Sequence, residues 1–456
     1  MTAHQSGGNA RRMAVDVLYQ LSAGRQSLDW LMESAYEKGG LDQRDKNLLY
    51  TLVYGVLRWR GRLDWTVAEL STRTFEKINP RVLNILRLGL FQLLFLDRVP
   101  DSAAVDTAVR LARSSGLAWA TGYVNALLRN FLRNRGKMQL PDYGKEPSTA
   151  LAVRKSLPRW LARRWIDRYG LKKAQMLADT VNRIPPLTVR ANTLKTTRTK
   201  LLTALAHETS AAEPTPYAPQ GITLKNPKHA VAQLAAFKFG LFQVQDEAAQ
   251  LVSIMLAPRP GEQVLDACAG LGGKTGHMAQ IMENQGHITA LDIRRWRLVK
   301  LEAEMKRLGI TIVTNQNRDL RAITDEGFQQ AFDRVLVDAP CSGLGVLQRN
   351  PDAKWSVSEY DLARQGRRQT LLLHHAAGQV KPGCTMVYAV CSIETEENED
   401  VVYEFLKNHP DFAVETAPLT NLPAARELVD MNGFLKTFPP RDAMDGFFAA
   451  TLKRQA

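Results

Sequence analysis

The sequence predicts an α/β protein whose C-terminal half is a doubly wound, mostly parallel sheet, preceded by an all-helical domain and a small α+β module. Three observations lead to this prediction. From Val264 onward, strand-length apolar runs alternate with loops and helix-length segments, as in doubly wound folds. Apolar residues in the first 140 positions recur at helical spacing, and no proline precedes Pro80. A chain of 456 residues is also too long for one core.

Residues 1–140 form the predicted all-helical domain. Its four apolar stripes are Ala14, Val17, Leu18 and Leu21; Leu48, Leu49, Leu52, Val53 and Val56; Val82, Leu83, Leu86, Leu90, Leu93 and Leu94; and Val124, Leu127, Leu128 and Phe131. Pro80 is a start signal for the third helix. The segment Arg58–Trp65 mixes cations with aromatic residues, as RNA-binding surfaces do. Alternatively, its tryptophans belong to the core and its arginines to a solvated helix face.

Residues 150–240 form the predicted small α+β module, which we interpret as an RNA-recognition or linker region after a linker at 136–148. Ser156 as N-cap, Pro158 in the first turn and Gly170 after the end predict a helix. Its basic residues are Arg154, Lys155, Arg159, Arg163, Arg164, Arg168, Lys172 and Lys173. This charge predicts phosphate contacts with a nucleic acid, and a solvated face is the alternative. After two prolines, residues 187–190 are predicted as a strand.

Residues 241–456 contain the predicted doubly wound sheet. The expected strands are 264–267, 288–291, 311–314, 334–337 and 385–390, and the expected helices are 294–308, 361–379 and 396–408. In such sheets, ligands bind beyond the carboxyl ends of the strands. The residues that follow these strands are therefore the candidates for chemistry.

The composition of the chain limits the classes of molecule that it is expected to bind. The formal net charge of +14 favours a polyanionic partner, nucleic acid before membrane. The first residues are polar and basic, unlike a secretory signal, and the most apolar stretch, Val82–Leu96, is too short to span a bilayer. Four cysteines without a CxxC pair argue against disulfides and zinc. We expect a cytoplasmic monomer that binds no membrane and no metal.

A glycine loop follows the first strand of the sheet, at Gly270–Thr275. It fails the P-loop pattern because Cys268 occupies the first glycine position, and it fails the dinucleotide pattern because Thr275 occupies the third. Asp292 ends the next strand, about twenty residues on, where a carboxylate accepts hydrogen bonds from ribose hydroxyls. S-adenosylmethionine contains a ribose but no phosphate. A loop that binds this cofactor therefore needs neither the P-loop pattern nor the dinucleotide pattern of glycines. A purely structural turn is the alternative.

Two cysteines follow strands. Cys341 lies in Asp338-Ala339-Pro340-Cys341 and Cys391 follows the last strand, and each is followed by serine. Methylation of cytosine C5 needs a thiolate that adds to C6, an acidic group at the N3 edge and a second acid or base. Cys391, Asp338 and Cys341 would supply these groups if the strand ends are adjacent. For Cys384 and Cys268, packing is the favoured interpretation.

The catalytic half resembles the RNA cytosine-C5 methyltransferase family, and the N-terminal half resembles NusB-like RNA-binding domains. The motifs are Asp338–Gly343, Arg349–Trp355, Cys391-Ser392 followed by Glu396-Glu397-Asn398, and Asp445–Phe448. Together, the two halves are similar to the bacterial Sun/Fmu (RsmB-type) 16S ribosomal RNA methyltransferases over essentially the whole chain. The resemblance implies a Rossmann-like S-adenosylmethionine methyltransferase domain behind an all-α NusB-like domain.

The resemblance also implies roles for single residues. Cys391 would be the nucleophile, Cys341 would assist product release, and Asp338 would lie near the base and the methionine end. The implied S-adenosylmethionine site comprises Cys268, Ala269, Gly270, Leu271, Gly272, Gly273, Lys274, Asp292, Asp319 and Asp338. The chain departs from the family pattern in two places: Gly270-Leu271 replaces the usual Ala-Pro, and Val390 replaces threonine.

Three functions are weighed. The first is methylation of C5 of a specific cytosine in 16S ribosomal RNA, free or in an assembling small subunit, through a Cys391–C6 adduct. The second is the same reaction on transfer RNA, which the N-terminal helical domain disfavours. The third is a non-catalytic RNA-binding factor for ribosome assembly, against which Asp338, Cys341, Cys391 and the glycine loop argue.

Overall fold

The structure is a computed structural model that describes residues 3–24, 26–322 and 331–456. The chain divides into two compact units. One unit comprises Met1–Arg183 and Asn350–Ser356, and the other comprises Ile184–Arg349 and Val357–Ala456.

The first unit is helical, as the apolar stripes predict. Its α-helices are α1 (Ala3–Ser22), α2 (Leu28–Lys38), α3 (Gln43–Leu70), α4 (Pro80–Phe95), α5 (Asp101–Ser114), α6 (Thr121–Asn134), α7 (Pro147–Lys155), α8 (Arg159–Val181) and α14 (Ala353–Ser356). Every residue of α4 from Val82 to Leu93 is buried, so the most apolar stretch of the sequence is a core helix. Pro80 starts α4 as predicted, and the Asn79 side chain accepts hydrogen bonds from the N–H groups of Arg81 and Val82.

The segment Arg58–Trp65 packs partly into this unit: Arg58 and Leu63 are buried and its other residues are half-buried, and RNA binding by it stays a prediction. Arg58 is buried, and the Trp59 ring stacks on Phe95 with 4.6 Å between ring centroids. Asp64 forms an ion pair with the buried Arg87, with 2.6 Å between Oδ1 and Nε. The packing alternative holds only in part: Trp59 packs in the bundle, but Arg58 is buried and does not belong to a solvated helix face.

The predicted basic helix exists as α8, but Ser156 is not its N-cap. Ser156 follows α7 in the left-handed conformation, with φ 54°, and its Oγ accepts a hydrogen bond from the Gly61 N–H at 2.8 Å. Helix α8 begins at Arg159, directly after Pro158. Gly170 ends the first part of α8 as predicted, because its φ of 76° and ψ of 159° are not helical. A second helical segment follows this kink and continues to Val181.

The short segment Asn350–Ser356 belongs to the helical unit although both flanking segments belong to the other unit. Its Lys354 is fully buried. The Lys354 Nζ donates hydrogen bonds to the carbonyls of Arg58 and Ser156 and to Asn182 Oδ1, at 2.8, 3.1 and 2.9 Å. These three acceptors compensate the cost of burying the amine. The segment is therefore an integral part of the helical unit.

The second unit begins with a small antiparallel sheet. Its strands are β1 (Leu187–Ala191), β2 (Thr209–Pro214), β3 (Gly221–Pro227) and β4 (Phe242–Val244), in the order β2-β3-β1-β4. Two helices, α9 (Arg198–Leu205) and α10 (Ala235–Lys238), accompany it. Strand β1 confirms the strand predicted at 187–190.

The larger sheet has eight strands. They are β5 (Gln263–Asp266), β6 (His287–Leu291), β7 (Val313–Gln316), β8 (Phe332–Asp338), β9 (Val380–Val390), β10 (Phe412–Val414), β11 (Phe434–Lys436) and β12 (Phe448–Arg454). The order is β10-β12-β9-β8-β5-β6-β7, with β11 beside β12. Strands β9, β8, β5, β6 and β7 are parallel, whereas β12 runs antiparallel to β9. The predicted doubly wound, mostly parallel sheet is confirmed.

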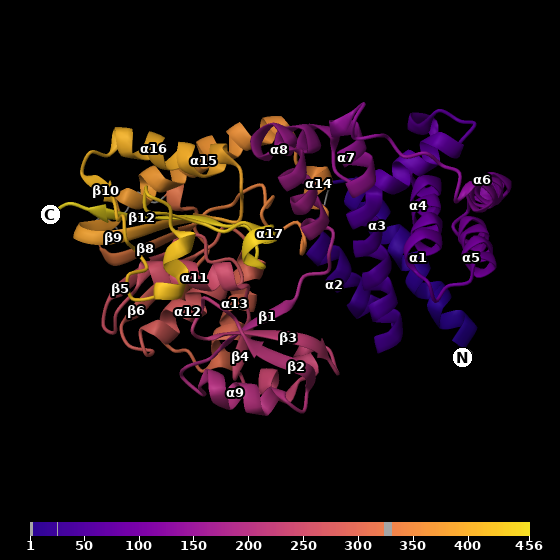
Figure 1. Ribbon diagram of the computed structural model, residues 1–456. Helices are drawn as coiled ribbons and strands as arrows, with labels where there is room; N and C mark the ends of the chain where they lie inside the picture. Colours follow the sequence, from indigo (N-terminus) through magenta and orange to yellow (C-terminus); the bar gives the residue numbers. More distant parts are fainter. Residues whose placement is uncertain (1–2, 25, 323–330) are drawn as a thin grey trace. The chain divides into compact units, whose positions relative to one another are not determined.

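Helices cover both faces of this sheet (Figure 1). Helices α11 (Glu247–Leu256), α12 (Gly273–Ile281) and α13 (Arg295–Leu308) share one apolar core, and α15 (Glu359–Ala377) and α16 (Glu399–Asn408) share the other. Strand β9 shows the alternation: Val387 and Ala389 enter the first core, and Met386, Tyr388 and Val390 the second. Because both faces of such a strand are buried, its sequence is a continuous run of apolar residues.

One strand starts later than predicted. The sequence places it at 311–314, but β7 spans Val313–Gln316. The reason lies in the end of α13, where Gly309 is left-handed and the Ile310 N–H donates to the Met305 carbonyl. Ile310 therefore still closes the helix and is not available to the sheet.

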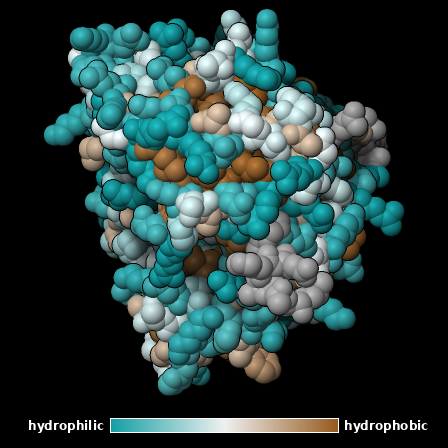
Figure 2. All heavy atoms as spheres, turned by 90° about the vertical axis from the view of Figure 1, so that its right-hand side faces the viewer, coloured by the Kyte–Doolittle hydropathy of each residue, from teal (hydrophilic) through white to brown (hydrophobic). Residues whose placement is uncertain are grey.

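Hydrophilic residues cover most of the face in Figure 2, and hydrophobic residues are visible between them in small groups. This face lies on the side where Figure 1 labels α5 and α6. Among the described residues, each helix is too short or too polar to span a bilayer.

Candidate functional site

The glycine loop lies between the ends of β5 and β6. The Ala269 N–H donates to the Leu291 carbonyl at 2.8 Å, and the Gly270 N–H donates to Asp292 Oδ2 at 3.1 Å. Gly272 has φ 85°, and a Cβ there would lie 2.8 Å from Leu301 Cγ. Gly270 has φ 57° and open space around it, so a ligand can approach its backbone. The loop is fixed against α13 on one side and accessible on the other.

Asp292 sits at the end of β6 and is nearly buried. Its Oδ1 accepts a hydrogen bond from the Arg294 N–H at 2.7 Å, and Arg297 Nη1 lies 3.5 Å from Oδ2. The Asn317 side chain donates to the Asp292 carbonyl at 2.8 Å. Each carboxylate oxygen has two lone pairs, so Asp292 retains the capacity to accept ribose hydroxyls.

Asp319 follows β7, and its carboxylate pairs with Arg321, with 2.6 Å between Oδ2 and Nη2. The hydrogen bond from Arg321 lowers the pKa of Asp319. Burial raises the pKa of the Cys268 thiol, and Asp266, Asp338, Asp292 and Asp319 raise it further. Cys268 is therefore a neutral thiol near all four carboxylates, which agrees with a packing role for this cysteine.

The fit to S-adenosylmethionine rests on this arrangement. A glycine backbone that a ligand can approach and a strand-end carboxylate suit an uncharged adenosine. The structure brings the loop and Asp292 into direct contact. Asp319, by contrast, bonds within its own turn. When bound, this cofactor supplies an electrophilic methyl group.

The structure brings Cys341 and Cys391 together, with 3.2 Å between their Sγ atoms. Both are half-buried free thiols. They lie beyond neighbouring parallel strands, in which Asp338 pairs with Ala389. The pKa of Cys341 is raised by its hydrogen bond with Cys391, by burial, and by the charges of Cys391 and Glu397. One sulfur that ionises therefore disfavours ionisation of the other.

Lys274 connects the glycine loop to this pair. Its Nζ lies 2.6 Å from Asp338 Oδ2 and 5.1 Å from the centroid of the Phe447 ring. Burial alone lowers the pKa of Lys274, but the charge and hydrogen bond of Asp338, together with the charge of Cys391, outweigh it and raise the pKa overall. Lys274 is therefore a buried ammonium beside both the acid and the cysteine. From the sequence, Lys274 is predicted only as part of the cofactor loop.

Arg349 and Asp445, which stand in two separate sequence motifs, meet in the structure. Arg349 Nε lies 2.7 Å from Asp445 Oδ2, and its Nη2 lies 2.8 Å from Asp246 Oδ2. Burial and the charge of Asp246 raise the pKa of Asp445 to about 7, against the opposing effect of Arg349. This clamp fixes the loop that begins at Cys341. An arginine and an aspartate in different motifs gave no signal of their pairing.

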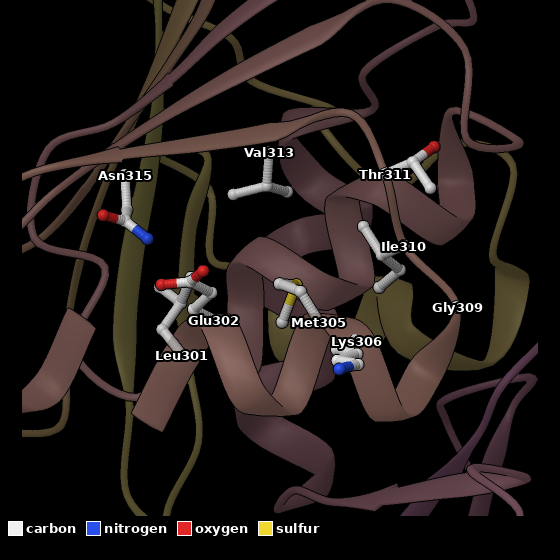
Figure 3. A pocket seen from close by; sticks show the side chains of 9 residues that line it. All are labelled: Leu301, Glu302, Met305, Lys306, Gly309, Ile310, Thr311, Val313 and Asn315. Atoms are coloured by element: carbon white, nitrogen blue, oxygen red, sulfur yellow. The ribbon is translucent and has the colours of Figure 1, made fainter. Parts of the chain in front are cut away.

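The cavity in Figure 3 lies elsewhere. It measures about 300 Å³ between α13 and β7, and its lining includes the apolar Leu301, Met305 and Ile310 together with Glu302 and Lys306. None of the predicted site residues lines it. The candidate site is thus defined by strand ends and contacts and not by this cavity.

Known protein families and relatives match this chain along its length. Residues 253–453 match the family model "16S rRNA methyltransferase RsmB/F", residues 8–133 the NusB family, and residues 157–231 the RsmF/B-like ferredoxin-like domain. The chain is 33% identical over 450 residues to the "Probable ribosomal RNA small subunit methyltransferase B" of Bacillus subtilis, covering 98% of this chain and 99% of that protein. The protein of the same name from Synechocystis is 35% identical over 446 residues, with the same coverage.

Two solved structures are also similar. The crystal structure of PH0851 has a TM-score of 0.83 at 27% identity and covers 98% of this chain and 99% of its own. A methyltransferase homolog from Pyrococcus horikoshii has a TM-score of 0.58, also at 27% identity, and covers 68% of this chain and 99% of its own. The first likeness extends over both units, and the second over about two thirds of the chain.

Proposed function

This chain belongs to the 16S rRNA methyltransferase RsmB/F family of S-adenosylmethionine-dependent enzymes, and on that premise we propose that it methylates C5 of a specific cytosine in 16S ribosomal RNA. The observation that supports the cytosine-C5 reaction is the contact between Cys341 and Cys391, 3.2 Å apart at adjacent strand ends. A pair of thiols at this position suits a reaction that needs one sulfur to attack C6 and a second group to help release the product.

In the proposed reaction, the Cys391 thiolate forms a bond to C6 and thereby makes C5 nucleophilic. Once C5 carries the methyl group, Cys391 is bound in the adduct and no longer charged, so Cys341 can release its proton to solvent and act as a thiolate base. The Cys341 thiolate takes the C5 proton and becomes a thiol, the electrons of the C5–H bond form the C5–C6 double bond, and Cys391 leaves C6 as a thiolate. The ammonium of Lys274, which forms an ion pair with Asp338, also interacts electrostatically with Cys391 and so places a positive charge near the attacking sulfur.

Lys274 and Asp338 also suit the edge of the base. The Lys274 Nζ donates a hydrogen bond to Asp338 Oδ2 at 2.6 Å. Cytosine presents an acceptor at N3 next to an amino donor at N4, so a Lys donor beside an Asp acceptor matches both atoms. We assign Asp338 and Lys274 to recognition of this edge, with Cys268–Lys274, Asp292 and Asp319 around the cofactor.

The division of labour along the chain follows. We assign RNA binding to the NusB-like helices of residues 1–140, RNA recognition or linkage to residues 150–240, and methyl transfer to residues 241–456. The last two assignments are supported by the ferredoxin-like and methyltransferase matches. Helices α7 and α8, in the second region, pack with the helical unit.

The test separates the roles of the two sulfurs. The Cys391→Ala protein should lose methylation and form no covalent complex with RNA, whereas Cys341→Ala should accumulate a protein–RNA adduct that survives denaturing electrophoresis. Cys384→Ala, at an unrelated half-buried thiol, is the control and should behave as wild type. An adduct from Cys391→Ala alone would reverse the roles of the two cysteines.

The substrate needs its own measurement. Bisulfite sequencing of ribosomal and transfer RNA, from cells with and without the protein, should show one 5-methylcytosine in 16S ribosomal RNA that depends on it. A lost site in transfer RNA would redirect the proposal to that substrate. Unchanged methylation of both RNAs would favour a non-catalytic role in ribosome assembly.

A further inference from the structure

A buried carboxylate holds the two cysteine loops. Glu397 lies in the short 3-10 helix Thr395–Glu397, and its exposed fraction is 0%. Its Oε1 accepts a hydrogen bond from the Ser342 N–H at 2.7 Å. Its Oε2 accepts hydrogen bonds from both Ser342 Oγ and Ser392 Oγ, each at 2.5 Å. These serines directly follow Cys341 and Cys391, so one carboxyl group ties together both loops that carry a thiol.

Glu397 is itself fixed from two directions. Gln369, on α15, donates from Nε2 to Glu397 Oε1 at 3.2 Å and to the Pro340 carbonyl at 3.0 Å. Tyr388, on β9, donates from its hydroxyl to the Glu397 carbonyl at 2.5 Å and contacts Gln369 Oε1 at 3.2 Å. Both residues are buried. The carboxylate is therefore held by the sheet and by a covering helix, and it has little freedom to move with the loops.

Such a carboxylate is costly to bury. In the part of the chain that the structure describes, no lysine or arginine forms an ion pair with Glu397. Its charge is instead stabilised by the serine, amide and glutamine donors named above. A simple packing role at this position would be served better by an uncharged side chain. Packing alone therefore does not explain why a carboxylate, that of Glu397, is buried next to Cys341.

The negative charge of Glu397 makes the surroundings of the Cys341 and Cys391 sulfurs electrostatically different. Glu397 contributes to raising the pKa of Cys341, after the hydrogen bond with Cys391, burial and the charge of Cys391. Lys274 has the opposite sign and interacts with Cys391. The negative group thus acts on one cysteine, and the positive group acts on its neighbour 3.2 Å away.

We propose that Glu397 is a positioning residue for methyl transfer: its carboxylate, hydrogen-bonded to the serines that follow Cys341 and Cys391, keeps the two loops in register and holds a negative charge beside the Cys341 loop. This inference rests on the proposed function and adds the group that makes two neighbouring cysteines unequal. The two serines and the Glu396-Glu397-Asn398 motif are visible in the sequence, but no local pattern connects them.

The first test is kinetic. Glu397→Gln retains the shape but replaces one acceptor oxygen by an amino group, so it cannot accept from all four donors. We expect kcat to fall by about 100-fold, the scale of a misplacement of about 1 Å, while KM for RNA changes less than about twofold. Glu396→Gln, at the half-buried neighbour, is the matched control and should retain wild-type kcat. A Glu397→Gln enzyme with wild-type kcat, or one whose loss lies wholly in KM, would overturn the proposal.

The second test does not depend on methylation. Alkylation of the full-length protein by iodoacetamide, followed across pH by peptide mass spectrometry, reports Cys341 and Cys391 separately. Glu397→Gln should move the alkylation profile of Cys341 to lower pH, because its thiolate no longer faces a carboxylate. An unchanged Cys341 profile in a folded variant would remove the electrostatic part of the proposal.

A third comparison guards against simple unfolding. Ser342→Ala and Ser392→Ala each remove one donor to Glu397, and each should reduce kcat by less than Glu397→Gln does. Combined with Glu397→Gln, either serine change should add little, because the interaction is already lost. Full additivity would contradict the proposal. If Cys391→Ala remained active, the proposed function would fail, whereas an inactive Cys391→Ala beside a fully active Glu397→Gln would refute only this inference.

Discussion

Asp266 ends β5 directly under the glycine loop, and it is a buried acid with an unusual proton affinity. Burial raises its pKa to about 7, against the hydrogen bond from Thr275 Oγ1 at 2.7 Å. In the unfolded chain the pKa of an aspartate is about 3.9. The folded protein therefore retains a proton that the unfolded chain releases between about pH 4 and pH 7.

This difference predicts how stability depends on pH. A raised folded pKa contributes stability that is complete below about pH 4 and is lost as the pH rises through about 7. For Asp266 the loss is on the order of 4 kcal/mol, at about 1.4 kcal/mol per pKa unit. Asp266→Asn should flatten the dependence, measured by urea unfolding between pH 4.5 and 8. Glu213→Gln, an exposed carboxylate paired with Lys225, should leave the curve unchanged. An equally steep curve for Asp266→Asn would contradict this account.

At the residue scale, the sequence predicted the groups that end strands and missed those that act across loops. Cys341, Cys391, Asp338 and Asp292 were predictable because apolar runs deliver them to one edge of a parallel sheet. The pairing of Lys274 with Asp338 was not predictable, because it depends on how the helix after the glycine loop is turned. The assigned roles of these residues, including Asp319, remain predictions until the variants are measured.

At the scale of elements, glycines allow the loop after Cys341 to meet the segment before β12. The Gly345 N–H donates to the Cys391 carbonyl at 3.1 Å, and the Gly446 N–H donates to the Gly345 carbonyl at 2.8 Å. A Cβ on Gly345 would lie 1.9 Å from the Gly446 carbonyl oxygen and 3.0 Å from the Cys391 carbonyl oxygen. Three segments of chain therefore meet where only a hydrogen atom fits.

Gly345→Ala should separate these segments and move the Cys391 backbone. We expect a loss of kcat of about 100-fold, from misplacement of the sulfur, and a lower melting temperature. Methylation assays and thermal unfolding of the same preparation measure both. Gly383→Ala, at a turn with open space around it, is a control for glycine replacement that should spare kcat. Wild-type kcat in Gly345→Ala would show that the loop tolerates this displacement.

The elements themselves were largely predictable, and the exceptions have local causes. Helix α4 was predicted from its apolar stripe and from Pro80, and the parallel strands from their apolar runs. Ser156 misled the prediction because a serine before a proline is typical of an N-cap, whereas here its hydroxyl serves the helix that contains Gly61. Long-range partners of this kind leave no trace in local sequence. The same holds for Lys354, whose three acceptors are more than 170 residues away.

At the scale of the whole molecule, the net charge of +14 makes a prediction about RNA affinity. Helix α8 exposes Arg159, Arg163, Arg168, Lys172 and Lys173. If three of these cations contact phosphates, replacing Arg163, Arg168 and Lys172 by glutamine should reduce the slope of log affinity against log salt by about 2 to 3. Filter binding at several salt concentrations measures the slope.

The control for this prediction is a second triple variant that removes the same charge elsewhere. Arg110, Lys225 and Arg364 each pair with a carboxylate, so their replacement by glutamine should change the slope much less. Equal effects of the two triple variants would mean that net charge, and not the face of α8, determines binding.

The position of β12 has a consequence for biosynthesis. Strand β12 lies inside the sheet, between β9 and β10, yet it is the last strand of the sheet to be translated. Until it emerges, β9 presents an unpaired edge that includes the apolar run Met386–Val390, the type of edge that invites aggregation. Translation that ends before Phe448 would therefore produce a fragment in which the edge of β9, next to Cys391, is unpaired and prone to aggregation. Such fragments should be substrates for chaperones and proteases and should not persist as partly active enzymes.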